Sequence, residues 1–282
     1  MTKSVCVVGG GTMGATVALT FSRAGFAVHL CGRNMDRSQA GKDQLSSMLE
    51  RKVSRGKMEA AERDALLERI TPSLLADCGD CVLAIEAINE VPEAKKKIYE
   101  ELEEVLSEGA ILASNTSSIS ITALANGLKH PSRFVGMHFF NPADVMALVE
   151  VISGAFTSEE TMLATEKIAA ELGKTSIRVK ESPGFVVNRV LIPMINEAVE
   201  LLDNGVASAV DIDTAMKLGA NHPMGPLELG DLIGLDVCLA IMEVLQSETG
   251  DDKYRPHPLL RKMVRAGWLG RKAGRGFHEY KR

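Results

Sequence analysis

The sequence predicts an α/β fold in which a domain of parallel strands and crossover helices precedes an all-helical domain. Short apolar runs alternate with helical patterns through the first part of the chain, which is typical of strands joined by helices. Ser182-Pro183-Gly184 then interrupts this pattern, and no strand-like alternation is visible beyond it. We therefore expect an α/β domain at residues 1–182 and a helical domain at residues 183–282.

The N-terminal domain is expected to begin with a strand at Ser4–Val8, a helix at Thr12–Ala24 and a second strand at Ala27–Leu30. A helical arm follows, from about Asp36 to Glu68. It is longer than the usual connection between two strands, which suggests that the arm has a function of its own. Its two helical segments are separated near Arg55-Gly56-Lys57.

Apolar runs bounded by turn residues predict the later strands. These are Cys81–Ala87, Ile111–Ser114, Phe134–Phe140, Leu148–Ile152 and Ser176–Val179. Pro92–Leu106 is a charged pattern with proline in its first turn, which predicts a helix. Phe185–Leu202 is apolar almost all the way round, as expected of a helix that is buried on several sides.

The composition is that of a soluble globular protein. Apolar residues make up 45% and charged residues 24% of the 282 residues, which argues against a disordered chain. The net charge of −5 gives no general attraction for nucleic acid or anionic lipid. No apolar run is long enough to span a bilayer, and we expect no signal peptide before the first strand. A cytoplasmic protein without nucleic-acid or membrane partners is expected.

Five cysteines occur, at positions 6, 31, 78, 81 and 238. Cys78 and Cys81 have the Cys-x-x-Cys spacing that occurs in redox pairs and in halves of zinc sites. No second Cys-x-x-Cys and no His-x-x-x-His follows, and Cys81 begins an apolar run. We therefore favour reduced, cytosolic thiols over a redox or metal role, and no metal is expected.

A glycine-rich segment follows the first strand. Gly9, Gly11 and Gly14 fit Gly-x-Gly-x-x-Gly, with Thr12 and Met13 before the last glycine. Such glycines allow a tight turn and close approach to a pyrophosphate, and the following helix N-terminus offers N–H groups to the phosphates. Because the motif lies between a strand and a helix, it predicts a Rossmann-type dinucleotide-binding domain.

The end of the second strand indicates which nicotinamide cofactor binds. NAD sites usually carry an acidic residue here that binds the adenosine ribose, whereas this chain has Gly32 followed by Arg33. An arginine binds a 2′-phosphate bidentately, and the missing carboxylate removes repulsion against that phosphate. Arg37 can add charge. We favour NADP(H), while NAD(H) stays open because Arg33 can instead be solvated or stack on adenine.

Two polar residues interrupt apolar strands, His138 within Met137–Phe140 and Glu150 within Leu148–Ile152. If these strands are neighbours, one imidazole nitrogen donates to Glu150 and the other exchanges a proton with a substrate. A satisfied core histidine is the alternative. The carboxylate and the upstream dinucleotide motif favour the catalytic interpretation.

Several motifs occur in one order along the chain. They are Gly9–Gly14, Ser114–Ser118, Met137–Pro142, Leu148–Ile152, Pro183–Arg189 and Asn221–Pro226. This series resembles the L-3-hydroxyacyl-CoA dehydrogenase family, in particular its short single-function 3-hydroxybutyryl-CoA dehydrogenases, over essentially the whole chain. The resemblance implies an oxidoreductase that interconverts (S)-3-hydroxyacyl-CoA and 3-oxoacyl-CoA by hydride transfer.

The resemblance also implies roles for individual residues. His138 corresponds to the family's general base and Glu150 to the carboxylate that orients it. Ser117 and Asn188 correspond to polar residues around the reacting oxygen. The cofactor positions correspond to Glu90, Lys95, Asn141 and Lys272, with Asn141 at the nicotinamide end, and the coenzyme A position corresponds to Lys52, with Lys57 as a second candidate.

Alternatives stay open for some of these residues. Ser118 is a rival of Ser117, and either hydroxyl can cap the helix expected near Ser120. Asn188 can be a buried amide that bonds across the domain junction. The arm lysines can belong to a solvated helix face.

Other functions stay open as well. One is an NAD(P)-dependent dehydrogenase of a free hydroxy or sugar acid on the same fold. Another is a non-catalytic dinucleotide-binding protein, against which the joint presence of Ser117, His138, Glu150 and Asn188 argues. Apolar stretches at Phe185–Leu202 and Leu227–Leu245 predict a homodimer that forms through the helical domain.

Overall fold

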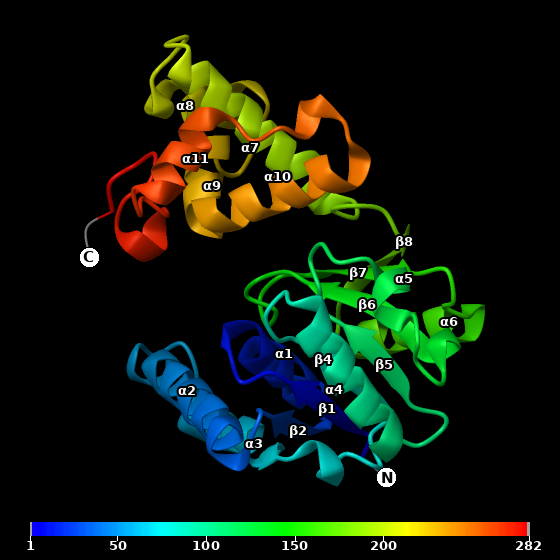
Figure 1. Ribbon diagram of the computed structural model, residues 1–282. Helices are drawn as coiled ribbons and strands as arrows, with labels where there is room; N and C mark the ends of the chain where they lie inside the picture. Colours follow the sequence, from blue (N-terminus) through cyan, green and yellow to red (C-terminus); the bar gives the residue numbers. More distant parts are fainter. Residues whose placement is uncertain (1, 281–282) are drawn as a thin grey trace. The chain divides into compact units, whose positions relative to one another are not determined.

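A computed structural model describes residues 2–280 (Figure 1). The chain divides into two compact units, of which the first ends at Glu181 and the second begins at Ser182. Every helix in residues 2–280 is too short or too polar to span a bilayer.

An eight-stranded sheet forms the centre of the first unit, in the order β3-β2-β1-β4-β5-β6-β7-β8. The strands are β1 (Ser4–Val8), β2 (Ala27–Cys31), β3 (Ile70–Ser73), β4 (Leu83–Glu86), β5 (Ile111–Ser114), β6 (Phe134–Phe139), β7 (Leu148–Ser153) and β8 (Thr175–Lys180). Neighbouring strands from β3 to β6 are parallel, β7 is antiparallel to β6, and β8 is parallel to β7. The order 3-2-1-4-5-6 is that of dinucleotide-binding domains, as the glycine motif predicted.

Helices cover both faces of this sheet. They are α1 (Thr12–Arg23), α2 (Met35–Ser54), α3 (Ala60–Glu68), α4 (Pro92–Val105), α5 (Ile121–Ala125) and α6 (Glu159–Glu171). Right-handed crossovers run outward in opposite directions from β1 and β4, which places α1 and α4 on opposite faces. The face toward α1 carries the apolar core, with Val5, Val7, Val28 and Leu30 buried.

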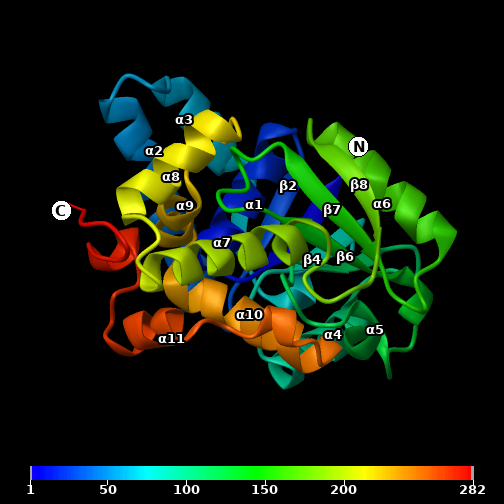
Figure 2. The same cartoon turned by 90° about the horizontal axis from the view of Figure 1, so that it is seen from above.

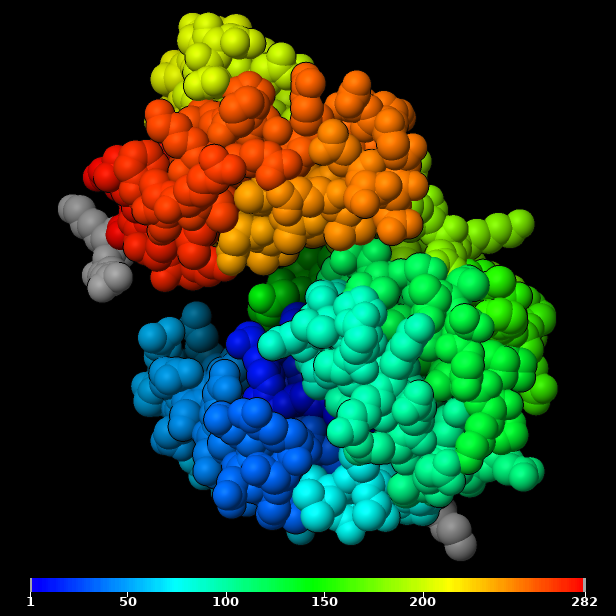
Figure 3. Space-filling model, viewed as in Figure 1, coloured from blue at the N-terminus to red at the C-terminus, as the bar shows by residue number. Residues whose placement is uncertain are grey.

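The expected helical arm is present as α2 and α3, which lie at the surface of the first unit (Figure 3). Only Ser38, Gly41, Leu45 and Leu49 of α2 are buried, so the helix contacts the unit along a narrow stripe. Most of its other residues are exposed or half-buried.

One strand was not predicted. β3 contains Pro72, and a proline argues against a strand because it cannot donate to the sheet ladder. Since β3 is the edge strand and pairs only with β2 among the described strands, the missing N–H is tolerated there.

The second unit is helical, as predicted. It contains α7 (Val187–Asp203), α8 (Ala209–Gly219), α9 (Pro226–Ile233), α10 (Leu235–Thr249) and α11 (Pro258–Arg265). α7 and α10 run side by side (Figures 1 and 2). Their apolar faces enclose a core that includes Ile195, Leu227, Met242 and Leu260.

The prediction that the apolar helix after residue 184 is buried on several sides is wrong. α7 buries Ile192, Ile195 and Val199, but Val190 is 69% and Leu201 is 36% exposed. The helix therefore leaves apolar side chains on the surface of its own unit.

Candidate functional site

The glycine-rich loop joins β1 to α1. Gly9 has a φ of +126°, and a Cβ there would lie 2.6 Å from the carbonyl oxygen of Ala87. A Cβ on Gly14 would lie 1.7 Å from the oxygen of Gly9. The close packing of the loop therefore requires both glycines.

Gly11 differs from these two glycines. A Cβ on Gly11 would meet no atom within 4 Å, and Gly11 is the N-cap of α1 without a side-chain cap. Thr12 is exposed and Met13 is half-buried in the first turn. The turn thus leaves room for a phosphate at a helix N-terminus, where N–H groups and the helix dipole favour an anion.

The turn after β2 has no space for an acidic side chain at Gly32. A Cβ there would lie 2.7 Å from Cβ of Arg37 and 2.8 Å from the backbone nitrogen of Ser38. The N–H of Gly32 donates to Oγ of Ser38 at 2.8 Å, which holds the start of α2 against the strand. Arg33 and Arg37 are both exposed at this turn.

His138 and Glu150 are direct partners in the register of β6 and β7. Nδ1 of His138 lies 2.7 Å from Oε2 of Glu150, and the two residues are 4% and 0% exposed. Because an ionised carboxylate only accepts, Nδ1 carries the proton and Nε2 is the nitrogen suited to proton exchange. The ring of Phe140 lies 4.6 Å from the imidazole, measured between centroids.

Asn115 holds the strand that carries His138, and sequence reasoning assigned it no role. Its Oδ1 accepts from the N–H of Phe139 at 2.8 Å, and its own N–H donates to the oxygen of Glu86 at 2.8 Å. Its place inside Ser114–Ser118 was the available signal.

Glu90 fixes the loop that carries Ser117. Its Oε1 accepts from the N–H of Ser117 at 2.6 Å and from Oγ1 of Thr116 at 3.0 Å. The N-cap of α5 is Ser120, whose Oγ accepts from the N–H of Ala123 at 3.0 Å. The alternative that Ser117 or Ser118 caps this helix is therefore wrong.

Lys95 lies in a buried network rather than on the surface, with 1% exposure. Its Nζ is 2.6 Å from Oε1 of Glu86 and 3.2 Å from Oε2 of Glu90. Tyr99 and Ser114 donate to the other oxygen of Glu86, at 2.5 and 2.9 Å. Burial raises the pKa of Tyr99 well above its usual value, and the charge of Glu86 adds to the effect.

Sequence reasoning missed Glu86 at the centre of this network. A glutamate that ends a buried apolar strand was the available signal, because a buried carboxylate needs charged or hydrogen-bonding partners. The network connects β4, β5 and α4 next to the segment that holds Ser117.

The other site residues that the sequence predicts in the first unit are more exposed than Lys95. Nζ of Lys52 is 3.0 Å from Oδ2 of Asp144, which also lies 3.5 Å from Nη1 of Arg23. Lys57 is exposed between α2 and α3, and Asn141 is exposed before the cis peptide bond to Pro142. The structure brings Lys52 to a carboxylate, not to a cluster with Lys57.

Asn188 and Lys272 belong to the second unit. Asn188 lies in the first turn of α7 and is 9% exposed. Nζ of Lys272 is 2.7 Å from Oδ2 of Asp236.

The motif Asn221–Pro226 has a structural role. The carboxylate of Asp213 accepts from the N–H groups of Leu227 at 2.8 Å and Glu228 at 3.0 Å, and so caps α9. A Cβ on Gly225 would lie 2.2 Å from Cβ of Asp213, so only glycine allows this approach.

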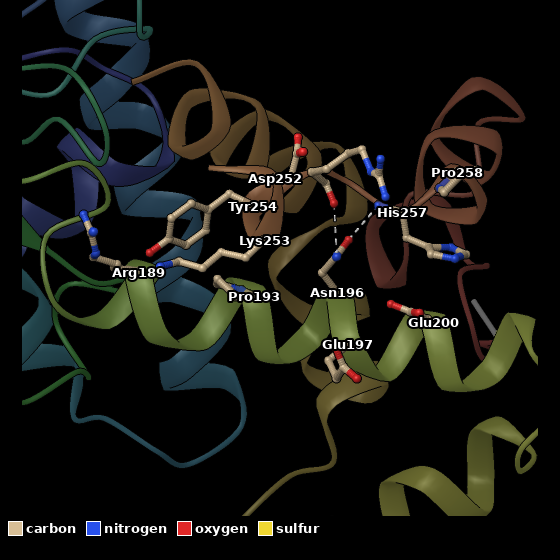
Figure 4. Close-up of a pocket in the computed structure, with 11 residues that line it drawn as sticks. Arg189, Pro193, Asn196, Glu197, Glu200, Asp252, Lys253, Tyr254, His257 and Pro258 are labelled. Atoms are coloured by element: carbon tan, nitrogen blue, oxygen red, sulfur yellow. Dashed lines mark hydrogen bonds between the residues drawn. The ribbon is translucent and has the colours of Figure 1, made fainter. Parts of the chain in front are cut away.

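A pocket of the second unit lies between α7 and the segment 252–258 (Figure 4). Asn196 connects the two sides, because its Nδ2 donates to the oxygen of Arg255 at 3.3 Å and its Oδ1 accepts from the N–H of His257 at 2.8 Å. None of the residues that line this pocket is a site residue expected from the sequence.

The strand order and the glycine-rich loop define a Rossmann-type dinucleotide-binding protein. The family model described as "3-hydroxyacyl-CoA dehydrogenase, NAD binding domain" matches residues 4–182. A second, described as "3-hydroxyacyl-CoA dehydrogenase, C-terminal domain", matches residues 184–280. The chain belongs to the 3-hydroxyacyl-CoA dehydrogenase family, which confirms the resemblance seen in its motifs.

Individual relatives are similar in sequence to this chain over nearly its whole length. A probable 3-hydroxybutyryl-CoA dehydrogenase of Bacillus subtilis is 50% identical over 279 residues, which cover 99% of this chain and 97% of the relative. The crystal structure of (S)-3-hydroxybutyryl-CoA dehydrogenase from Ralstonia eutropha is 47% identical, with a TM-score of 0.93 and full coverage of both chains. The structure of FadB2 from M. tuberculosis is 42% identical, with a TM-score of 0.94 and 98% coverage of both.

Proposed function

We propose that the protein interconverts (S)-3-hydroxyacyl-CoA, with 3-hydroxybutyryl-CoA as its main substrate, and the corresponding 3-oxoacyl-CoA. The observation that carries the proposal is the contact of 2.7 Å between His138 and Glu150, in a domain that also holds a dinucleotide loop. Relatives of about half identity that are named 3-hydroxybutyryl-CoA dehydrogenases support the choice of substrate.

His138 is the proton acceptor in the direction of oxidation. Its Nε2 takes the proton of the 3-hydroxyl group, and Glu150 stabilises the imidazolium that forms and keeps the ring oriented. The bound cofactor would supply the nicotinamide ring as the acceptor of the hydride that leaves C3 of the substrate. In reduction, His138 returns the proton to the oxygen.

Ser117 and Asn188 are proposed as hydrogen-bond donors to the substrate. A donor at the reacting oxygen stabilises charge that develops there as the bond order changes. For Ser117 the support is the contact of its N–H with Glu90, which fixes the backbone that carries the hydroxyl. For Asn188 the support is the match of its motif to the family.

NADP(H) is the proposed cofactor. The support is the pair of exposed arginines at 33 and 37 beside Gly32, where packing leaves no room for the carboxylate of an NAD site. Gly9, Gly11, Thr12, Met13 and Gly14 would hold the pyrophosphate. Glu90, Lys95, Asn141 and Lys272 are proposed as further positions near the cofactor.

Coenzyme A is proposed to contact the helical arm. Lys52 and Lys57 lie at the end of α2 and in the turn that follows, where ammonium groups suit phosphate. The ion pair with Asp144 orients the side chain of Lys52. Its ammonium group would then contact both Asp144 and a phosphate of coenzyme A.

A homodimer that forms through the helical domain, residues 183–282, is also proposed. Val190 in α7, Val210 in α8 and Leu218 in α8 are 69%, 62% and 83% exposed in the single chain. Such apolar side chains favour an interface. Sedimentation equilibrium should give the mass of two chains, and Val190→Lys with Leu218→Lys should shift it toward one chain; a monomeric wild-type protein would contradict the proposal.

The test of the reaction uses purified protein with acetoacetyl-CoA and either NADH or NADPH, followed by nicotinamide absorbance. Rapid oxidation of one cofactor is expected, and no turnover with either would contradict the proposal. Acetoacetate is tested in parallel as a free acid without the thioester. This comparison is warranted because a diketoreductase, described as acting on dicarbonyl compounds, is 30% identical with a TM-score of 0.85. Turnover of acetoacetate without turnover of the thioester would favour the free-acid alternative.

A further inference from the structure

Three of the four cysteines in the first unit, Cys6, Cys31 and Cys78, meet on one side of the sheet. Cys6 lies in β1 and Cys31 ends β2, whereas Cys78 and Cys81 follow the short helix η1 (Leu75–Asp77). All four are 0% exposed. The fifth, Cys238, lies in α10 of the second unit.

The sheet register explains why Cys6 and Cys31 point the same way. Cys6 pairs with His29 and Val8 pairs with Cys31. Because paired residues and residues two apart in a strand share a face, both thiols project from the same face of the sheet. The segment that carries Cys78 and Cys81 packs over them there, as the sulfur contacts show.

The sulfur atoms are spaced as metal ligands are. Sγ of Cys31 is 3.7 Å from Sγ of Cys6 and 3.6 Å from Sγ of Cys78, and all three lie within 4.8 Å of one another. Tetrahedral zinc thiolates have Zn–S bonds of about 2.3 Å, which corresponds to about 3.8 Å between sulfurs. The thiols therefore need only small shifts to share one ion.

Cys81 lies outside this group of three sulfurs. Its sulfur lies within 4.8 Å of ligand atoms of His29 and Asp80 instead. The Cys-x-x-Cys spacing therefore contributes one ligand, Cys78, to the site.

The ligand atoms also select a class of cation. A thiolate is the form that binds a metal, and soft sulfur ligands select thiophilic ions.

We propose that Cys6, Cys31 and Cys78 form a three-sulfur site for a thiophilic divalent cation, with zinc as the representative ion. Binding exchanges the waters of the ion for sulfur, and each ligating thiol that is still protonated releases its proton to solvent. No electron is transferred, and the three sulfurs stay at the thiol oxidation level.

The role of this site is structural. The oxygen of Cys31 accepts from the N–H of Gly9 at 2.8 Å, and Gly32 follows Cys31 directly. An ion at the cluster would therefore fix β1, β2 and the segment 78–81 to one another next to the dinucleotide loop. Metal that binds only the folded chain stabilises it and raises its Tm.

The first test uses reduced wild-type protein and Co²⁺ as a spectroscopic substitute for zinc. One Co²⁺ per chain is expected, with the intense visible bands and sulfur-to-cobalt charge transfer of tetrahedral thiolate coordination, and Zn²⁺ should displace it. Absence of bound ion, or a weak spectrum typical of oxygen ligands, would overturn the proposal.

Cysteine variants identify the ligands. Cys31→Ser and Cys78→Ser should weaken Zn²⁺ binding by more than the roughly 10- to 100-fold that loss of a supporting residue costs. Cys238→Ser is the matched control and should bind Zn²⁺ as the wild type does. If Cys238→Ser weakens binding and the other two variants do not, the site lies elsewhere.

A measurement on the wild type avoids dependence on the folding of variants. Zn²⁺ should protect Cys6, Cys31 and Cys78, but not Cys238, from a maleimide in mild denaturant, as peptide mass spectrometry can show. Equal labelling with and without Zn²⁺ would overturn the proposal. So would a Cys31–Cys78 disulfide in the purified protein together with no ion bound after reduction, which would indicate a redox pair instead.

Discussion

Nδ1 of His138 lies 2.7 Å from Oε2 of Glu150 because the two residues are direct partners in the antiparallel pair β6–β7. Strand geometry itself holds the imidazole and the carboxylate together, and both side chains are buried. A buried carboxylate beside histidine fixes the tautomer of the ring and stabilises its protonated form.

Glu150→Gln tests the charge of that carboxylate. Glutamine keeps the shape of the side chain but cannot stabilise an imidazolium, so kcat for acetoacetyl-CoA should fall by about 10²-fold or more. Glu171→Gln is a suitable control, because Glu171 pairs with Lys3 at the surface of the same unit. Wild-type kcat in Glu150→Gln would show that the charge has no part in proton transfer.

Gly14→Ala should lower the stability of the protein, whereas Gly11→Ala should weaken cofactor binding. A Cβ on Gly14 meets the oxygen of Gly9 at 1.7 Å, so Gly14→Ala should lower the free energy of unfolding by about 1–3 kcal/mol or more. Gly11→Ala meets no neighbour within 4 Å and should leave stability nearly unchanged while it raises the Kd of the cofactor. Urea unfolding and cofactor titration distinguish the two, and a tight cofactor complex of Gly11→Ala would argue against a phosphate at this turn.

Arg33→Ala tests the choice of cofactor. Removal of a guanidinium that binds the 2′-phosphate should raise the Kd of NADPH by about 10- to 100-fold, since a charged hydrogen bond contributes about 1.5–3 kcal/mol, and should change the Kd of NADH little. Arg51→Ala, an exposed arginine further along α2, is the control. Unaltered NADPH binding in Arg33→Ala would refute the role of Arg33.

Tyr99→Phe should destabilise the protein in a pH-dependent way. The phenol donates to Glu86, and its loss should lower the free energy of unfolding by about 1–3 kcal/mol near pH 8. Burial raises the pKa of Tyr99, so its neutral phenol stabilises the fold fully below the unfolded pKa of about 10 and loses this effect as the pH rises through the folded pKa.

The difference in stability between wild type and Tyr99→Phe should therefore shrink from about pH 8 to about pH 11. Tyr280, whose pKa is raised to about 12, is present in both proteins and cancels from the difference. Urea unfolding at the two pH values measures it. A difference that grows with pH would mean that the phenol is not held neutral by the fold.

Local signals in the sequence were sufficient for much of the fold. β1 and β5 have the predicted bounds, since each is a short apolar run between turn residues. The edge strand β3 was missed because Pro72 argues against a strand unless its place in the sheet is known. The apolar stretch Phe185–Leu202 led both to the wrong expectation of burial on several sides and to the prediction of a dimer, because apolar composition does not distinguish a core from an interface.

Some contacts of the candidate site could also be predicted from the sequence, and others could not. The proximity of His138 and Glu150 could be predicted because consecutive strands tend to be neighbours. The contact of Lys95 with Glu86, and that of Cys6 and Cys31 with Cys78, join residues from separate elements. The spacing of these residues along the sequence does not predict such contacts, so only the folded structure shows them.

Turnover of acetoacetyl-CoA by His138→Gln tests the proton-transfer role of His138 most directly. The variant should bind the nicotinamide cofactor with wild-type Kd, because His138 lies outside the glycine-rich loop, while its kcat falls by about 10²- to 10⁴-fold. An unchanged kcat in His138→Gln would contradict the role of His138 as the group that exchanges the substrate proton.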